Sequence, residues 1–343
     1  MNKKQITGMI IAAVIIIVTG ITGIASNVIS EKFKESAAKK EEQTTDMFSS
    51  LLDSGEVDID APDGPYIGRL DIIGTIQGST SDTLATGDTS TYNHNVLMKF
   101  VDEMEKDSNN KGILLYVDSP GGTVYHSDEL YLKLMEYKEK TKRPIYAYFV
   151  TEACSGGYYI SMAADKIYAN RNCMTGSIGV IMSMYNYSEL FKKVGVEEID
   201  ITSGANKAMG SGGLEMTEEQ KEILQSMVDE AYDQFTGIVS EGRNMDINTV
   251  KKLADGRIYT ALQAKENNLI DEIGSLDDLK AALEEADGVG KGVEYYKPEG
   301  DTFSDIFSSI LGEIQNITKK SDVQIVQELI NNPTDGVLMY YAK

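Results

Sequence analysis

Histidine and cysteine are both scarce in this chain. Among its 343 residues there are only two histidines, His94 and His126, so the usual proton acceptor of enzyme chemistry has few candidates. Two cysteines, Cys154 and Cys173, are too few for a disulfide framework and form no CxxC metal motif. We expect two small buried thiols, with a disulfide between them as an unsupported alternative.

Basic residues are also few relative to acidic residues. The chain has 32 basic and 54 acidic residues, which gives a net charge of −22 at pH 7. Nucleic-acid binding needs a basic surface, and anionic lipid attracts basic segments, so the charge balance argues against both partners. We expect a solvated acidic surface that keeps the folded part soluble.

A long uncharged run is present at the N-terminus, where no charged residue occurs between Lys4 and Glu31. As a helix, residues 5–30 would be about 39 Å long, enough to cross a hydrocarbon core of about 30 Å. A cleaved signal peptide is the alternative, but its apolar region is usually shorter. We therefore predict that residues 1–30 are a cytoplasmic N-terminus and transmembrane anchor. Lys3 and Lys4 favour the cytoplasmic side, with the rest of the chain outside the cytoplasm.

The remaining chain divides by composition. Residues 31–62 are charged and compatible with a helix, which is typical of a stalk or linker. The turn sequence "PDGP", 62–65, marks a boundary, and we predict a folded domain over 63–290. Residues 291–343 are an acidic tail whose role the sequence does not identify.

Strand and helix patterns alternate along the folded domain. Helical spacing and a capping-box pattern at Thr217 and Gln220 predict helices, whereas apolar or alternating runs predict strands. The predicted helices cover 96–108, 127–142 and 217–242, and the predicted strands cover 112–118, 144–150, 166–170 and the alternating "EEIDITS" at 197–203. This alternation predicts an α/β domain with a largely parallel sheet.

Three glycine-bearing stretches follow predicted strands: "DSPGG" at 118–122, "CSGGYY" at 154–159 and "TGSIGV" at 175–180. Ser155 stands at a strand-to-helix turn, the geometry that exposes a nucleophile. Gly121 and Gly122 carry no side chain that would cover their N–H groups, so two of these groups could hold an oxyanion. Each stretch alone also fits an ordinary turn, but three at successive strand ends indicate a site.

The proton acceptor is harder to identify. We expect His94, in a polar loop, to be a surface residue. His126 lies near the oxyanion candidate and could assist there, but nothing beside it in the sequence resembles an orienting triad. A lysine can act as the base if its surroundings keep it neutral. Lys207, in "TSGANKAMG" at 202–210, has no carboxylate within five residues, unlike most lysines of the chain. By spacing alone, a flexible loop lysine remains the favoured interpretation.

These motifs resemble those of the membrane-bound S49 serine peptidases, the signal peptide peptidase A family of the ClpP/crotonase superfold. The similarity covers roughly residues 67–280 and fits the short, single-unit form of the family. The motifs that carry it, in family order, are "DSPGG", "SGGYYIS", "TGSIGV", "SGANKAMG" and "DGRIYTALQAKENNLIDEIGSLDD".

The resemblance implies a Ser–Lys dyad, with Ser155 as nucleophile and Lys207 as general base. Ser177 matches the family position that orients the lysine, Gly122 matches the oxyanion glycine, and Gly156 would supply a second N–H. It further implies a homo-oligomeric ring, expected to be an octamer, whose active sites are shared between protomers. The expected substrates are apolar remnant signal peptides bound as added strands, and no metal or organic cofactor is implied.

Some residues depart from the family pattern. Cys154 stands before the nucleophile where a small residue such as alanine is common, and Asn268 replaces a common glycine. Two other functions stay open at this point. One is a catalytically idle oligomeric membrane scaffold or regulator with the same fold, and the other is an acyl-CoA enzyme of the crotonase branch. The predicted anchor and external location disfavour the acyl-CoA enzyme.

Overall fold

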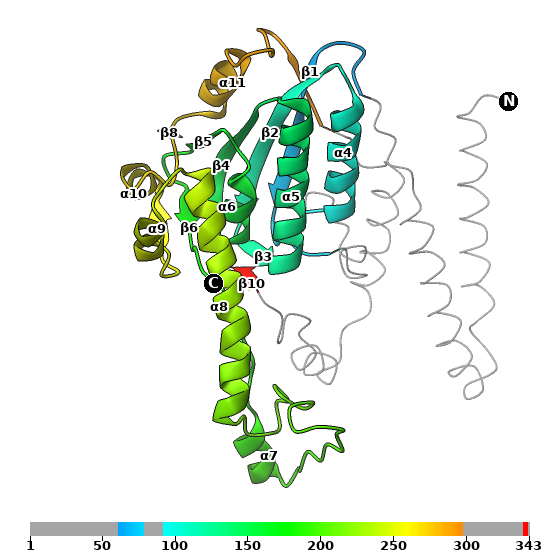
Figure 1. Cartoon of the computed structure of the whole chain (residues 1–343), viewed down its shortest axis with the longest axis vertical. Helices are drawn as coiled ribbons and strands as arrows, with labels where there is room; N and C mark the ends of the chain where they lie inside the picture. The colour runs from blue at the N-terminus through cyan, green and yellow to red at the C-terminus, as the bar shows by residue number, and fades with distance from the viewer. Residues whose placement is uncertain (1–60, 79–91, 298–338, 342–343) are drawn as a thin grey trace, which may run out of the picture. The chain divides into compact units, whose positions relative to one another are not determined.

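A computed structural model describes residues 61–78, 92–297 and 339–341 (Figure 1). The strands are β1 Tyr66–Ile73, β2 Asn110–Ser119, β3 Gly121–Thr123, β4 Ile145–Cys154, β5 Lys166–Ala169, β6 Met174–Gly176, β7 Ile258–Thr260, β8 Glu272–Ile273, β9 Glu294–Tyr296 and β10 Met339–Tyr341. The helices are α4 His94–Lys106, α5 Val124–Thr141, α6 Gly156–Ser161, α7 Ser188–Val194, α8 Glu218–Gly242, α9 Ile247–Leu253, α10 Ala261–Glu266 and α11 Leu276–Glu284.

The main sheet is largely parallel, as the alternating pattern predicts. Its central order is β7-β6-β4-β2-β1-β9, and β5 joins β4 to β8. The β6–β7 pair is antiparallel, whereas every other pair in this sheet is parallel. A separate two-stranded pair joins β10 to β3 in antiparallel order.

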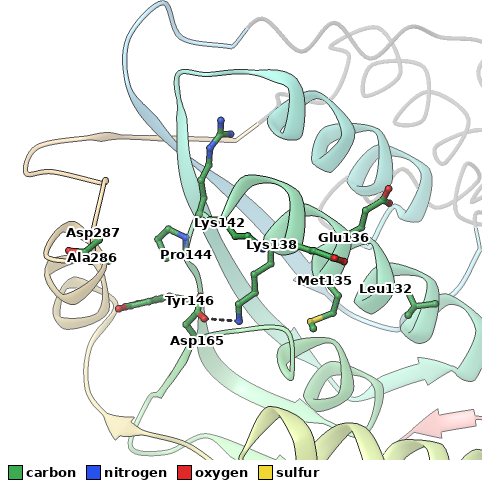
Figure 2. A pocket seen from close by; sticks show the side chains of 12 residues that line it. Leu132, Met135, Glu136, Lys138, Lys142, Pro144, Tyr146, Asp165, Ala286 and Asp287 are labelled. Atoms are coloured by element: carbon green, nitrogen blue, oxygen red, sulfur yellow. Dashed lines mark ion pairs between the residues drawn. The ribbon is translucent and has the colours of Figure 1, made fainter.

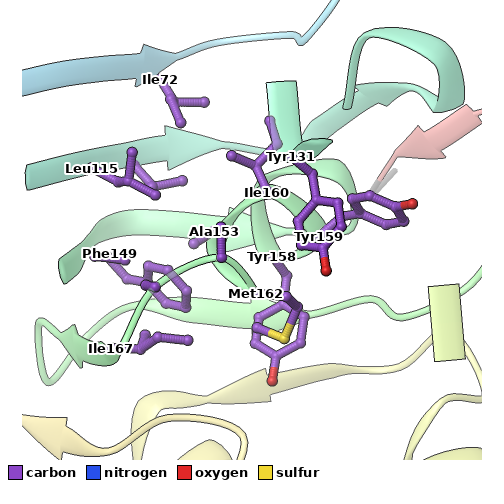
Figure 3. Packing of buried hydrophobic residues seen from close by; sticks show 14 of the residues in the cluster. Ile72, Leu115, Tyr131, Phe149, Ala153, Tyr158, Tyr159, Ile160, Met162 and Ile167 are labelled. Carbon is purple, nitrogen blue, oxygen red and sulfur yellow. The ribbon is translucent and has the colours of Figure 1, made fainter. Parts of the chain in front are cut away.

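Both faces of the central strands are covered, which explains their near-continuous apolar runs. In β2, Ile113, Leu115 and Val117 belong to the larger hydrophobic cluster, whereas Leu114 belongs to the smaller cluster beside α11. Successive side chains of a strand point to opposite faces, so one strand supplies both clusters. Figure 3 shows side chains of β1, β2, β4 and α6 meeting in the larger cluster.

The predicted helices are confirmed with small changes in their bounds. In α4 the buried residues include Leu97, Phe100, Val101 and Met104, which form one helical stripe. At the start of α8 both hydrogen bonds of the predicted capping box are present, between Thr217 and Gln220.

Helix α8 is buried only in its C-terminal half. Its buried residues are Ala231, Phe235, Thr236 and Val239, and none occurs in the first 13 residues of the helix, 218–230. The first half therefore extends beyond the sheet, and Figure 1 shows α7 and the adjoining chain at its far end. We call residues 181–217, which lie at this end, the distal segment.

One predicted strand does not form. Residues 197–203 have neither helix nor strand structure, and Ile201 is 99% exposed. The alternation of Ile199 and Ile201 predicted a strand, but the distal segment offers no neighbouring strand to satisfy its backbone hydrogen bonds. Local alternation alone therefore misassigned this stretch.

Two segments of the predicted tail take part in the fold. β9 pairs with β1 in the main sheet, and β10 pairs with β3. The predicted anchor, 1–30, and residues 31–60 of the predicted stalk lie outside the described residues. Within the part of the chain that the structure describes, no helix is long and apolar enough to cross a bilayer.

Candidate active site

The three glycine-bearing stretches meet at one edge of the sheet. At the carboxyl end of β2, Ser119 pairs with Ala153 of β4, and at the end of β4, Cys154 pairs with Gly176 of β6. Because these strands are parallel neighbours, their carboxyl ends lie side by side. The loops that follow them therefore face the same space, as the sequence predicts.

Ser155 occupies a strained turn between β4 and α6. Its φ of 51° and ψ of −113° lie in a region that non-glycine residues rarely adopt. The backbone supports this conformation, since its N–H donates to the carbonyl of Gly176 at 2.8 Å and its carbonyl accepts from Tyr159 at 2.8 Å. The side chain is 1% exposed, and its Oγ has no hydrogen-bond partner among the described residues. A hydroxyl buried without a partner is uncommon, and such groups concentrate at functional sites.

The predicted oxyanion glycines lie against Ser155. A Cβ on Gly156 would stand 3.1 Å from the amide nitrogen of Gly122, and a Cβ on Gly121 would stand 2.7 Å from the amide nitrogen of Gly156. These backbones approach so closely that side chains would collide there. The structure thus brings one hydroxyl and two amide nitrogens together, which is an arrangement suited to acyl transfer.

Ser177 also lies at this edge, directly after β6. Its φ is 49° and it is 8% exposed, and its N–H donates to the carbonyl of Arg257 at 2.8 Å. Its neighbour Gly176 accepts the N–H of Ser155, so the two serines are separated by a single backbone hydrogen bond and one peptide unit. The structure therefore brings together four of the five predicted site residues.

Lys207 is the predicted residue that the fold does not bring to this edge. It is exposed in the distal segment, and its side chain makes no hydrogen bond or ion pair with any residue the structure describes. Gln220 of α8 donates to the carbonyl of Ala205 in the distal segment, and Gln234 donates to the hydroxyl of Tyr159 beside the site. These two glutamines are about 21 Å apart along the helix axis. Lys207 is therefore remote from Ser155 within one chain.

β10, which the sequence analysis missed, covers the site. It runs antiparallel along β3, with Tyr340 opposite Gly122. The Tyr340 side chain is fully buried, with its ring 4.8 Å from that of Tyr159 and 4.7 Å from that of Phe235, and its hydroxyl donates to the carbonyl of Ala231 at 3.1 Å. The only available signal was a short apolar run, "GVLMYY", near the C-terminus. β10 therefore lies where an extended peptide would lie against the site.

One of the two histidines lies elsewhere than the sequence suggested, and the other lies where it was expected. His94 is 4% exposed and hydrogen-bonded to Glu129, so its assignment to the surface was wrong. The error arose because the polar loop context does not reveal that α4 begins at this residue and turns its ring toward α5. His126 belongs to the first turn of α5, next to β3.

Both cysteines are free and buried, as expected. Burial raises the pKa of the Cys154 thiol to about 12, and the nearby Glu152 carboxylate adds to the shift. Cys154 therefore stays protonated beside Ser155 and acts as a small apolar residue. Asn268 has a φ of 60°, which explains why glycine is common there, since asparagine tolerates this left-handed region better than most residues.

The pocket shown in Figure 2 is a different feature. Its volume is about 870 Å³, and it lies near the amino end of β4, where Lys138 and Asp165 form an ion pair at 2.6 Å. The two ends of β4, Ile145 and Cys154, are about 30 Å apart. The pocket therefore shares no residue with the site at Ser155. No group of three or more metal-ligating side chains occurs in the described residues.

Removing β10 is expected to uncover Ser155. A chain that ends at residue 337 should react several-fold faster with a serine-directed fluorophosphonate than the full chain, because β10 no longer shields the Oγ. The rate of covalent labelling measures this, and the truncated Ser155→Ala chain, which should not be labelled, is the control. Equal labelling rates in both lengths would show that β10 does not restrict access.

Comparison with known proteins supports the chemistry suggested by this geometry. The family model "Peptidase family S49" matches residues 137–290. The chain is 40% identical over 258 residues to "Putative signal peptide peptidase SppA" of Enterococcus faecium, covering 73% of this chain and 74% of that protein. It is 40% identical over 188 residues to a "Putative protease" of Methanocaldococcus jannaschii, covering 55% of this chain and 60% of that protein.

A longer relative is also similar. The chain is 30% identical over 255 residues to "Protease 4" of Haemophilus influenzae, covering 74% of this chain and 40% of that protein. The matched family model includes the Ser155 turn and the loop of Ser177, which the structure places at the site. On this evidence the chain belongs to peptidase family S49 and is a peptidase of the SppA type.

Proposed function

We propose that this protein is a serine endopeptidase that uses Ser155 as its nucleophile. The observation that carries the proposal is the buried Ser155 hydroxyl, unpartnered among the described residues, beside two amide nitrogens and a peptide strand laid along β3. In the reaction the Oγ forms a bond to the substrate carbonyl carbon while its proton passes to a base. The N–H groups of Gly122 and Gly156 hold the resulting oxyanion. The C–N bond then breaks, the amine leaves with the proton from the base, and water hydrolyses the acyl-enzyme.

Lys207 is the proposed base, and it would come from a neighbouring copy of the chain. This assignment follows the family pattern and accords with the distance between the distal segment and Ser155 within one chain. Ser177 would hold the lysine in place. It directly follows Gly176 at the end of β6, whose carbonyl accepts the N–H of Ser155. The proposed active site is therefore complete only in an oligomer, expected to be a ring of eight.

The distal segment has the character of a contact surface. Large apolar side chains are exposed on it, including Val194 at 63%, Ile199 at 74% and Ile201 at 99%. The N-terminal half of α8, which leads to this segment, has no buried residues. An exposed apolar surface of this kind is typical of an oligomer interface. A neighbouring copy would cover these side chains and bring Lys207 to a Ser155.

The proposed substrates are extended apolar peptides such as remnant signal peptides. β10 supports this substrate class, because it binds β3 through main-chain pairing and places an aromatic side chain among Tyr159 and Phe235. The name of the Enterococcus faecium relative points to the same class. In this proposal residues 1–30 anchor the enzyme in the cell membrane, with its N-terminus in the cytoplasm and its catalytic domain, of the ClpP/crotonase type, outside. The mechanism needs no metal or organic cofactor.

Replacement of either dyad residue is expected to abolish peptide cleavage. Ser155→Ala removes the nucleophile and Lys207→Ala removes the base, so both should lower kcat by at least about 10³-fold. The measurement is cleavage of a fluorogenic apolar peptide by the oligomer. Lys207→Arg should be equally inactive, because a guanidinium does not deprotonate. Full activity of Ser155→Ala would refute the proposal, and a silent wild type with an intact ring would favour the scaffold interpretation.

Mixing the two inactive variants is expected to restore activity if the site is shared. In a randomly mixed ring, about a quarter of the interfaces would unite an intact Ser155 with an intact Lys207 from the next copy. Cleavage should therefore recover to about a quarter of the wild-type rate. Mass spectrometry of differently labelled subunits verifies co-assembly, and proven co-assembly without recovery would place the whole site in one protomer.

Gly122→Ala is expected to damage catalysis by displacing an oxyanion donor. The added Cβ would overlap the backbone of Ile76, so β3 would have to move. A lost donor costs about 10²–10³-fold in kcat. Gly237→Ala in α8 is the matched control, because its Cβ would meet nothing within 4 Å. It should retain wild-type activity, whereas equal kcat values for both variants would exclude the oxyanion role.

A further inference from the structure

The only two histidines of the chain pack against each other directly behind β3. His94 opens α4 and His126 lies in the first turn of α5. Their ring centroids are 4.8 Å apart, with the rings nearly perpendicular at 79°. The proposed reaction uses neither ring. The groups around the two rings indicate what role the pair has.

Hydrogen bonds assign the tautomer of His94. Its Nε2 lies 2.8 Å from a carboxylate oxygen of Glu129, and its Nδ1 lies 2.6 Å from the hydroxyl of Tyr92. A carboxylate only accepts, so Nε2 carries the proton. In the neutral ring Nδ1 then accepts from the Tyr92 hydroxyl.

His126 holds the last residue of β3. Its Nδ1 lies 2.6 Å from the Oγ1 of Thr123, which also accepts the backbone N–H of His126 as the N-cap of α5. The hydroxyl proton of Thr123 is therefore available to donate to Nδ1. On its other side, Nε2 faces Gly78, where a Cβ would stand 2.9 Å from this nitrogen. His126 is thus wedged between β3, the segment after β1 and His94.

Thr123 connects this pair of histidines to the oxyanion groups. It follows Gly122 in β3, and its N–H donates to the carbonyl of Ile76 at 2.8 Å. Its own carbonyl accepts from the Ser127 hydroxyl at 2.8 Å, and the oxygen of that hydroxyl would stand 2.4 Å from a Cβ on Gly156. Thr123 is therefore bonded to Gly122 in β3 and linked to Gly156 through Ser127, so a shift of Thr123 would disturb the surroundings of both proposed oxyanion donors.

The surroundings of the pair favour a neutral His126 ring. Burial lowers the pKa of His126, and His94 lowers it further, while Glu129 opposes the shift. Burial alone would raise the pKa of Glu129, but hydrogen bonds from His94 and Tyr125 outweigh it and lower the pKa overall. Among the described residues, the titratable groups that face His126 are thus His94, Glu129 and Tyr125, while Tyr92 contacts the far ring of the pair, His94. The single carboxylate can balance one imidazolium, and a second proton would be uncompensated.

We propose that neutral His126 is a positioning residue that holds Thr123, and through it the N–H of Gly122, in place for the substrate carbonyl. A proton on His126 turns Nδ1 from an acceptor into a donor, so the Thr123 hydroxyl can no longer donate to it and must reorient. The same proton places a positive charge beside the ring of His94, so the brace on β3 is disturbed. The inference rests on the proposed oxyanion role of Gly122. It gives the peptidase a second acid-sensitive group besides the base.

The direction of the pH effect follows from the lowered pKa. Because the folded protein favours neutral His126, this group contributes to stability above its ordinary value of 6.5. That contribution is lost as the pH falls through the lower pKa of the folded state. The brace is therefore complete at neutral pH and released in acid.

The test compares two replacements of His126 in the full chain. In His126→Asn, Oδ1 replaces the Nδ1 acceptor without titrating, so kcat/KM at neutral pH should stay within about twofold of wild type. Its acid limb should involve one proton fewer than that of the wild type. In His126→Leu the acceptor is lost, and kcat/KM should fall at least about tenfold at all pH values, mainly through kcat. Identical acid limbs in wild type and His126→Asn, or full activity of His126→Leu, would overturn the proposal.

A second readout does not depend on cleavage. With two histidines in the chain, ¹³C-labelled histidine gives two ring signals, which His94→Gln assigns by removing one. The His126 signal should titrate below 6.5 in the inactive Ser155→Ala chain and shift to higher pH in Ser155→Ala with His94→Gln. Titration unaffected by His94→Gln would overturn the coupling of the pair. Because this result needs no catalysis, failure of the proposed dyad and failure of the histidine brace are distinguishable.

Discussion

The site depends on one constraint of the sheet, which is that β2, β4 and β6 are parallel neighbours and end at a common edge. The hydrogen bond from the Ser155 N–H to the Gly176 carbonyl, 2.8 Å long, joins the ends of β4 and β6. A slip of one residue in this register would exchange the faces of every side chain in the strand. The hydrophobic clusters on both faces therefore stabilise the register, and the register places Ser155.

The strained backbone conformations at the site are held in place by the packing behind them. Ser155 and Ser177 both have positive φ, and such conformations persist only where the surroundings over-determine them. The helix after Ser155 is anchored by two buried tyrosines. Tyr158 donates to the carbonyl of Leu269 at 2.7 Å, and Tyr159 donates to Asp128 at 2.6 Å. The core thus offsets the cost of a turn that keeps the serine hydroxyl unpaired.

Helix α8 has one buried half and one half without buried residues. Its C-terminal half packs on the body and contributes Phe235, whose ring lies 4.7 Å from that of Tyr340. Its N-terminal half has no buried residue and leads to the distal segment, which includes Lys207. Covering by β10 and the proposed bracing by His126 would both act on the same short strand, β3. A neighbouring copy would instead supply Lys207 beside Ser155.

The family resemblance supplied the roles of Ser177 and Gly156. The sequence by itself determined the α/β class, the approximate bounds of the main helices, and Ser155 and the glycine-bearing strand ends that meet at the site. These features are local, because side-chain periodicity, capping residues and glycine turns act over a few neighbouring positions. It could not reveal that residues 197–203 lack a partner strand, that His94 is buried, or that Tyr340 lies opposite Gly122. Those facts depend on contacts between segments far apart in the chain, such as the 35 residues between His94 and Glu129. Only the tertiary structure decided them. Burial and strand pairing depend on two segments at once, whereas a local sequence pattern describes one segment.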